Sequence, residues 1–239
     1  MPFFLQIPVG AMQNFSYLVG EENGEVACID PGWDAEKIFL LAQKNGVHIT
    51  KILLTHVHYD HSGAAEALLE MVCSSRDGAC TVSTPTPNTS CTISTPVLQC
   101  VSTPQIFASA NIPKWKRNAS PDHGKWVVPQ NFTPISGETQ DFTSLQFSIG
   151  KFPIQVYDAP GHQSDHLLFE IAEYLFTGDT LFIGNIGGTH FEDSNPEEMQ
   201  KTLKMISTLP DSLIVCPGHD YGAVPMRTLG EEKMLNPYL

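Results

Sequence analysis

Positively charged residues are scarce in this sequence of 239 residues. It holds 13 Lys and Arg against 26 Asp and Glu, a formal net charge of −13. This excess disfavours nucleic acid and anionic membrane surfaces as partners. No run approaches the roughly 20 apolar residues that span a bilayer, and the N-terminal residues show no basic segment followed by an apolar one. We therefore expect a cytoplasmic protein with a small-molecule partner.

Motifs of several other enzyme classes are also missing. The sequence has no Gly-rich phosphate loop, no G-x-S-x-G motif and no C-x-x-C pair, which argues against a P-loop enzyme, a serine hydrolase and a zinc ribbon. Cys28 and Cys216 lie in apolar runs and are expected to be buried free thiols. Four further cysteines lie between residues 73 and 100. We expect reduced thiols there, with a disulfide as the alternative.

Strand-like and helix-like runs alternate along most of the chain. Asp34 and Asn195 stand at the starts of two of the helix-like runs, where they are candidate N-terminal caps. Alternation of this kind predicts a layered α/β fold. Expected strands lie at 15–20, 25–30, 48–55, 145–149, 154–157, 166–171, 174–177 and 212–216, and expected helices at 34–45, 62–72 and 196–207.

One segment breaks this pattern. Seventeen of the 31 residues from 74 to 104 are Ser, Thr or Pro, which disfavours a helix and leaves few apolar residues for a core. A flexible insertion and a lid or partner-binding loop are both open. Lys114–Arg117 is a basic, aromatic cluster, either for an anionic substrate tail or on a solvated loop. We expect one domain, 1–239, with a Ser/Thr/Pro-rich insertion at about 74–134.

Potential metal ligands gather directly after strands. The H-x-H-x-D-H run after the strand at 48–55 packs four of them into six residues, and three later strand-like runs each end in Gly next to a His or Asp. Side chains at strand ends can converge on one rim of an α/β fold, and His with carboxylates binds divalent metals. The candidate ligands are His56, His58, Asp60, His61, His162, Asp179 and His219.

These motifs resemble those of the metallo-β-lactamase-fold superfamily. The matching segments are T-H-x-H-x-D-H from Thr55, G-H at Gly161, G-D-T at Gly178 and P-G-H-D-Y at Pro217. The resemblance runs from about Asn14 to Leu239 apart from the insertion, and within the superfamily it is to the glyoxalase II-like thioesterases and persulfide dioxygenases. It implies a four-layer αβ/βα sandwich with a metal site at one edge.

The resemblance also implies a ligand set. Two divalent ions are implied, zinc foremost, with iron or manganese as alternatives. They would supply a metal-bound hydroxide, and Asp60 would orient the attacking water. By motif, His56, His58 and His162 would hold one ion, Asp60, His61 and His219 the other, and Asp179 would bridge them.

Three positions bear on the substrate. Asp179 stands where many true β-lactamases have Cys, which argues against antibiotic hydrolysis. Gly188 and His190 stand where many relatives have a basic residue and an Asp, which argues against a glutathione-linked substrate. His190 is either an active-site donor or a surface histidine. Tyr221 matches a tyrosine that contacts the thiol substrate, with plain packing as the alternative.

The leading hypothesis is therefore a metal-dependent thioesterase similar to hydroxyacylglutathione hydrolases, acting on a small thioester as a monomer or homodimer. The alternative is a mononuclear non-haem iron persulfide dioxygenase, with iron on His56, His162 and Asp179. A binding protein of this fold without activity is a third possibility. A nuclease of this fold fits poorly with the net charge of −13.

Overall fold

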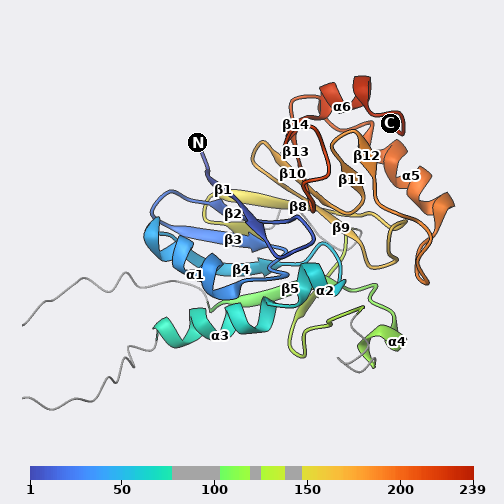
Figure 1. The fold of residues 1–239 in the computed structure, drawn as a ribbon. Helices are drawn as coiled ribbons and strands as arrows, with labels where there is room; N and C mark the ends of the chain where they lie inside the picture. The colour runs from blue at the N-terminus through green and yellow to red at the C-terminus, as the bar shows by residue number, and fades with distance from the viewer. Residues whose placement is uncertain (77–102, 119–124, 138–146) are drawn as a thin grey trace, which may run out of the picture.

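Two mixed β-sheets pack face to face in the computed structural model, which describes residues 1–76, 103–118, 125–137 and 147–239 (Figure 1). The first sheet has the order β1 (Phe3–Val9), β2 (Asn14–Gly20), β3 (Glu25–Ile29), β4 (His48–Leu53), β5 (Gln105–Ser109) and β6 (Thr133–Ile135). The second has the order β14 (Arg227–Thr228), β13 (Ile214–Pro217), β10 (Tyr174–Gly178), β9 (Leu167–Ile171), β8 (Phe152–Asp158) and β7 (Ser148–Ile149). A small hairpin joins β11 (Leu181–Phe182) to β12 (Asn185–Ile186).

Helices cover the outer face of each sheet (Figure 1). The first sheet is covered by α1 (Ala35–Lys44) and α3 (Ala65–Arg76), the second by α5 (Pro196–Ile206). Shorter helices are α2 (Tyr59–Ser62), α4 (Lys114–Arg117) and α6 (Leu229–Leu235). Among the described residues, no helix has the length and apolar character needed to cross a membrane.

Alternating side chains build three apolar layers. In β2, Leu18 packs toward α1 and α3, whereas Tyr17 and Val19 pack toward the second sheet. The same alternation holds in β3, where Cys28 faces the helices and Ala27 the other sheet. A third layer lies between the second sheet and α5. Helix, sheet, sheet and helix therefore form the four layers expected of an αβ/βα sandwich.

Strand directions bring the candidate ligand loops to one edge. β4 runs parallel to β3 and β5 in the first sheet. In the second sheet β10 runs parallel to β13, and β8 has the same direction because β9 is antiparallel to both β8 and β10. The carboxyl ends of β4, β8, β10 and β13 meet where the two sheets converge, and the loops that leave them face one another.

Several local expectations can be checked directly. The Asn195 side chain accepts hydrogen bonds from the N–H groups of Glu197 and Glu198, so it caps α5 as expected. The expected cap at Asp34 is wrong: its backbone is left-handed, with φ of 54°, and its carboxylate accepts from the Gly10 N–H instead. Cys28 and Cys216 are buried free thiols.

The expected insertion at 74–134 extends too far. Within it, β5 pairs with β4 and β6, so residues from Gln105 onward belong to the first sheet. These strands are short and lack a long alternating pattern, and their place depends on pairing with β4. The Ser/Thr/Pro repeats, with Cys80, Cys91 and Cys100, lie outside the described residues.

Candidate metal centre

Four loops bring the seven candidate ligands together. The loop after β4 carries His56 and His58, and its short helix α2 carries Asp60 and His61. The other three follow β8, β10 and β13. The seven side chains form three overlapping groups, and within each group the ligand atoms all lie within 4.8 Å of one another. The groups are His56, His58 and His162; His56, His61 and Asp179; and Asp60, His61 and His219.

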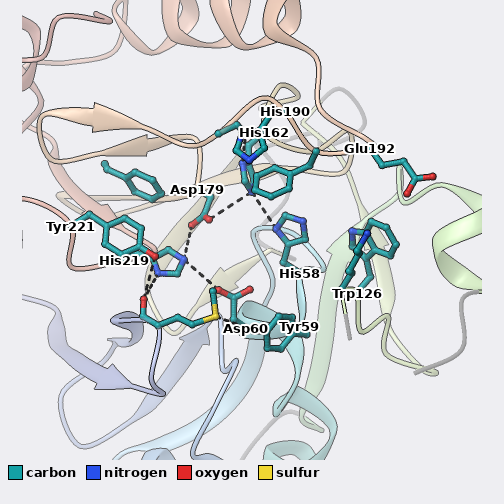
Figure 2. A pocket seen from close by; sticks show the side chains of 15 residues that line it. His58, Tyr59, Asp60, Trp126, His162, Asp179, His190, Glu192, His219 and Tyr221 are labelled. Atoms are coloured by element: carbon teal, nitrogen blue, oxygen red, sulfur yellow. Dashed lines mark hydrogen bonds and ion pairs between the residues drawn. The ribbon is translucent and has the colours of Figure 1, made fainter. Parts of the chain in front are cut away.

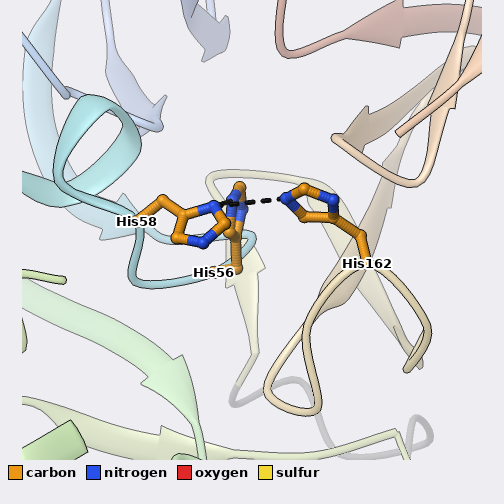
Figure 3. Close-up of side chains that lie close together, drawn as sticks. All are labelled: His56, His58 and His162. Carbon is orange, nitrogen blue, oxygen red and sulfur yellow. Dashed lines mark hydrogen bonds between the residues drawn. The ribbon is translucent and has the colours of Figure 1, made fainter. Parts of the chain in front are cut away.

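Three imidazoles converge in the first group (Figure 3). His56 Nε2 lies 2.9 Å from His58 Nδ1, and His162 Nε2 lies 3.2 Å from the same atom. In the group of Asp60, His61 and His219, the Nε2 atoms of His61 and His219 are 3.2 Å apart. Asp60 Oδ2 lies 3.4 Å from His219 Nε2.

Asp179 lies between the two groups (Figure 2). Its Oδ1 is 3.2 Å from His61 Nε2 and 3.4 Å from His219 Nε2, and its Oδ2 is 3.6 Å from His162 Nε2. Oδ1 is buried, yet it accepts no hydrogen bond of good geometry from the described residues. A buried carboxylate oxygen without a hydrogen bond is costly unless a cation binds it.

Hydrogen bonds at the outer ring nitrogens turn the inner ones toward the centre. His162 Nδ1 donates to the Gly188 carbonyl at 2.8 Å, and His219 Nδ1 donates to the Met12 carbonyl at 2.9 Å. His61 Nδ1 donates to Asp30 Oδ2 at 3.0 Å. Protonation at Nδ1 leaves the Nε2 lone pairs facing inward, where they repel one another at these distances. A shared cation resolves that repulsion, so the donor set fits divalent metals.

Asp30 organises two of the ligands at once. Its carboxylate accepts from the Thr55 N–H at 2.7 Å and from the Thr55 hydroxyl at 2.6 Å. Because that hydroxyl proton goes to Asp30, Thr55 Oγ1 accepts from His56 Nδ1 at 3.0 Å. Asp30 thus fixes the ring of His61 directly and that of His56 through Thr55.

Charges in the cluster favour ionised carboxylates. Burial would raise the pKa of both Asp60 and Asp179, but the neighbouring imidazoles hold both values below the ordinary range. Burial, with His162 next, lowers the pKa of His58 to about 3. Burial would also lower the pKa of His219, but Asp179 and Asp60 raise it to about 9. Ionised carboxylates and a neutral His58 are already in the form that binds a metal, and a bound ion would take the place of the proton on His219 Nε2.

Glycines let the loops approach closely. A Cβ on Gly218 would lie 2.6 Å from Asp179 Oδ1 and 2.7 Å from the ring of His61. Gly178 has φ of +47° and lies against Thr55 and His166. A side chain at either position would push ligands apart.

The family model for the metallo-beta-lactamase superfamily matches residues 9–70 and 107–219. The chain belongs to this superfamily. Hydroxyacylglutathione hydrolase GloC of Haemophilus influenzae is 28% identical and covers 98% of this chain and 96% of that protein. A hydroxyacylglutathione hydrolase of Enterobacter is 25% identical and covers 97% of this chain and 74% of that protein. These findings support a metal-binding hydrolase fold.

Solved structures share the fold. The di-iron-bound form of TTHA1623 superimposes with a TM-score of 0.71 at 26% identity, and covers 98% of this chain and 100% of its own. BLEG-1, a B3 metallo-beta-lactamase, gives 0.73 at 24% identity, with 99% of each chain covered. ETHE1 from Myxococcus xanthus gives 0.69 at 24% identity, covering 98% and 83%. The last two likenesses concern the fold alone.

A pocket of about 480 Å³ opens over the metal-ligand cluster. Tyr221 and His190, singled out from the sequence, both line it (Figure 2). The Tyr221 ring stacks on His219 with centroids 4.6 Å apart, and its hydroxyl donates to the Met12 carbonyl at 3.3 Å. His190 packs against Phe191 and belongs to none of the groups of candidate ligands. Tyr221 therefore lies against a candidate ligand, whereas His190 lies in the pocket wall.

Lys116 makes a buried ion cluster that the sequence did not suggest. The side chain is fully buried, so a solvated face is wrong for this member of the 114–117 cluster. Its ammonium donates to Asp165 Oδ1 at 2.5 Å and to Gln163 Oε1 at 2.7 Å, and lies 2.7 Å from Asp193 Oδ2. Asp165 Oδ2 accepts from the N–H of Val57, which stands between two of the histidines. The cluster ties α4 to the ligand loops.

His166 is another contact that sequence reasoning did not assign. It directly precedes β9, as expected, but it is buried and stacks on His56 with ring centroids 4.8 Å apart. Its Nε2 accepts from the backbone N–H of Asp179 at 3.1 Å, and its Nδ1 lies 3.1 Å from Thr180 Oγ1. The short spacing from His162 is the only sequence signal that pointed to this role.

Proposed function

We propose that this protein is a metal-dependent thioesterase that uses two divalent ions to activate water. The observation that carries the proposal is the placement of Asp179, whose two oxygens face the two ligand groups from between them. Such a carboxylate suits two ions held close together. The names of the two hydroxyacylglutathione hydrolase relatives support a thioester as substrate.

The assignment of the ligands to the two ions in this proposal is the one that the sequence resemblance implies. His56, His58 and His162 would hold one ion, and Asp60, His61 and His219 the other. When bound, the ions would lower the pKa of water to roughly 7 and polarise the thioester carbonyl. We assign zinc as the first candidate metal, with iron and manganese as alternatives.

In this proposal Asp60 would also orient the attacking water. Asn14 Nδ2 donates to Asp60 Oδ2 at 3.0 Å and to the Asp60 carbonyl at 3.2 Å, which fixes the carboxylate. The ionised carboxylate can accept a hydrogen bond from water while its Oδ2 faces His61 and His219. Tyr221 and His190 line the route to the centre, where they would contact the thiol or acyl part of the substrate.

Metal content and thioester turnover test the proposal together. Protein purified without chelator should carry about two metals per chain, and it should hydrolyse thioesters without consuming oxygen. Asp179→Ala should lose metal and activity together, because both ligand groups lose a member, whereas Asp211→Ala changes a distant surface carboxylate and should keep both. Full activity in Asp179→Ala would refute the proposal.

The same samples judge the persulfide dioxygenase alternative. About one iron per chain, with oxygen uptake on a persulfide and no thioester hydrolysis, would replace the thioesterase proposal by that alternative. The presence of both ligand groups favours the dinuclear hydrolase, because a single iron on His56, His162 and Asp179 would leave the group of Asp60, His61 and His219 without a metal.

A further inference from the structure

The walls of the pocket are aromatic and apolar. Five Phe, Tyr and Trp rings line it, those of Tyr59, Trp126, Phe182, Phe191 and Tyr221. Figure 2 shows three of them, Tyr59, Trp126 and Tyr221, beside side chains of the candidate ligands. Phe191 and Tyr221 are 42% and 52% exposed although both are large hydrophobic residues. Large apolar side chains left uncovered in a pocket mark the place where a ligand supplies the missing contacts.

Positive charge is nearly absent from these walls. Among the described residues that line the pocket, Lys125 is the one Lys or Arg, and Glu192 is also a lining residue. The residues outside the described ranges contain no Lys or Arg at all. Lys116 is close in sequence, but its ammonium is already bound by Asp165 and Asp193.

Glutathione makes opposite demands on a pocket. The tripeptide carries two carboxylates, several bonds away from its sulfur, so they would lie among the walls rather than over the metals. Carboxylates taken from water need paired donors, above all Arg or Lys. Lys125 is the one Lys or Arg among the described lining residues, so it can pair with only one of the two carboxylates.

Gly188 also lines the pocket without adding a charge. A Cβ on Gly188 would lie 2.7 Å from the ring of His190 and 3.2 Å from that of Phe191. The space beside this glycine is therefore filled by the rings of His190 and Phe191, and a longer basic side chain would need that space.

We propose that the substrate is a thioester with a bulky aromatic or apolar group beside the thioester bond, and not a glutathione thioester. This inference rests on the proposed thioesterase function for the reaction, and on the aromatic, cation-poor walls for the substrate class. It departs from the names of the two relatives, which share the metal motifs but are only 25–28% identical.

Binding of stable thioethers tests the preferred substrate class independently of the thioesterase reaction. Titration calorimetry of the protein with its metals would compare S-methylglutathione, S-benzylglutathione and the uncharged N-acetyl diethyl ester of S-benzylglutathione. The benzyl group should tighten binding at least 10-fold over methyl, since the rings bury it. The N-acetyl diethyl ester masks the ammonium together with both carboxylates, and it should bind at least another 5-fold more tightly. Tighter binding of the charged parent, or no benzyl effect, would overturn the inference.

Two variants localise the effect. Phe191→Ala should weaken binding of S-benzylglutathione about 5–10-fold, while Tyr238→Ala, which removes an equally exposed ring outside the pocket, should not. Gly188→Arg combined with His190→Ala should tighten S-benzylglutathione at least 10-fold by supplying a cation and the space for it. Equal effects of Phe191→Ala and Tyr238→Ala would contradict the assignment of the walls.

Turnover gives the second readout. The lactoyl thioester of benzyl mercaptan should show a kcat/KM at least 10-fold above that of the lactoyl thioester of glutathione. The reverse order would overturn the inference and leave the thioesterase proposal standing. Hydrolysis of neither compound would refute the thioesterase proposal, and the binding series would then still decide which groups the pocket prefers.

Discussion

Replacing Lys116 by Met should destabilise this protein severely, although the residue binds no metal. Its ammonium is surrounded by Asp165, Asp193 and Gln163, and the side chains of Lys116 and Asp165 are fully buried. Met has a similar length and apolar stem, so the substitution removes the charge and leaves the packing. Asp165 would then remain as a buried carboxylate with no cation.

The expected loss follows from the state of that carboxylate. Breaking a buried pair by removing one partner costs about 3–5 kcal/mol, which is a large part of the 5–15 kcal/mol that stabilises a typical domain. Burial already raises the pKa of Asp165 despite the opposing effect of Lys116. Asp193 is partly exposed and can turn toward water, so most of the cost falls on Asp165. Lys116→Met with Asp165→Asn should recover most of the loss, because no buried charge remains.

Urea unfolding followed by circular dichroism measures this directly. With a slope of about 3 kcal/mol per molar, the midpoint of Lys116→Met should fall by about 1–2 M. Lys201→Met is the matched control, since Lys201 also pairs with a carboxylate but lies exposed on α5, and it should leave the midpoint unchanged. A loss below 1 kcal/mol in Lys116→Met, or no recovery in the double variant, would refute the reasoning.

Three further substitutions test residues that hold the candidate ligands or a helix in place. The backbone of Asp30 is left-handed, with φ of 47°, a conformation that Asn also tolerates. Asp30→Asn should therefore keep the backbone but set an amide donor against Thr55 and His61, so zinc affinity measured against a chromogenic chelator should fall about 10–100-fold. Gly218→Ala should prevent metal loading, measured by elemental analysis, because the new Cβ would displace Asp179. Normal loading would contradict the close packing at this position. Asn195→Ala should lower the free energy of unfolding by about 1 kcal/mol through loss of two cap hydrogen bonds, with metal content unchanged.

The convergence of the candidate metal ligands was predictable because their signal is local. His56, His58, Asp60 and His61 lie within six residues after a strand, and each later ligand also follows a strand and a glycine. Strands whose carboxyl ends share one edge of the fold bring such loops together, and this does not depend on the details of the intervening sequence. Some elements were predicted for the same reason, since β2, β3 and β4 are apolar, β-rich runs and α5 has a helical apolar spacing.

The residues that hold the ligand loops in place were not predictable, because their contacts join positions far apart in the sequence. Asp30 lies 31 residues before His61, at the end of the expected strand at 25–30, and nothing in the nearby sequence pointed to that contact. Lys116 lies 49 residues from Asp165 in a cluster whose composition is typical of a surface. Polar residues of this kind become buried only when a partner of opposite charge meets them in the fold.

The segment around β5 shows where composition misleads. Ser, Thr and Pro dominate residues 74–104, and that bias suggested an insertion reaching to about 134. The family model instead breaks off at residue 70 and resumes at 107, inside β5, so α4 and its lysine fall within the superfamily match. A five-residue strand such as β5 has too few positions for a periodic signal, and it is defined by its register against β4 and β6. Because α4 follows that strand, the pairing of β5 is also what delivers Lys116 to the ligand loops.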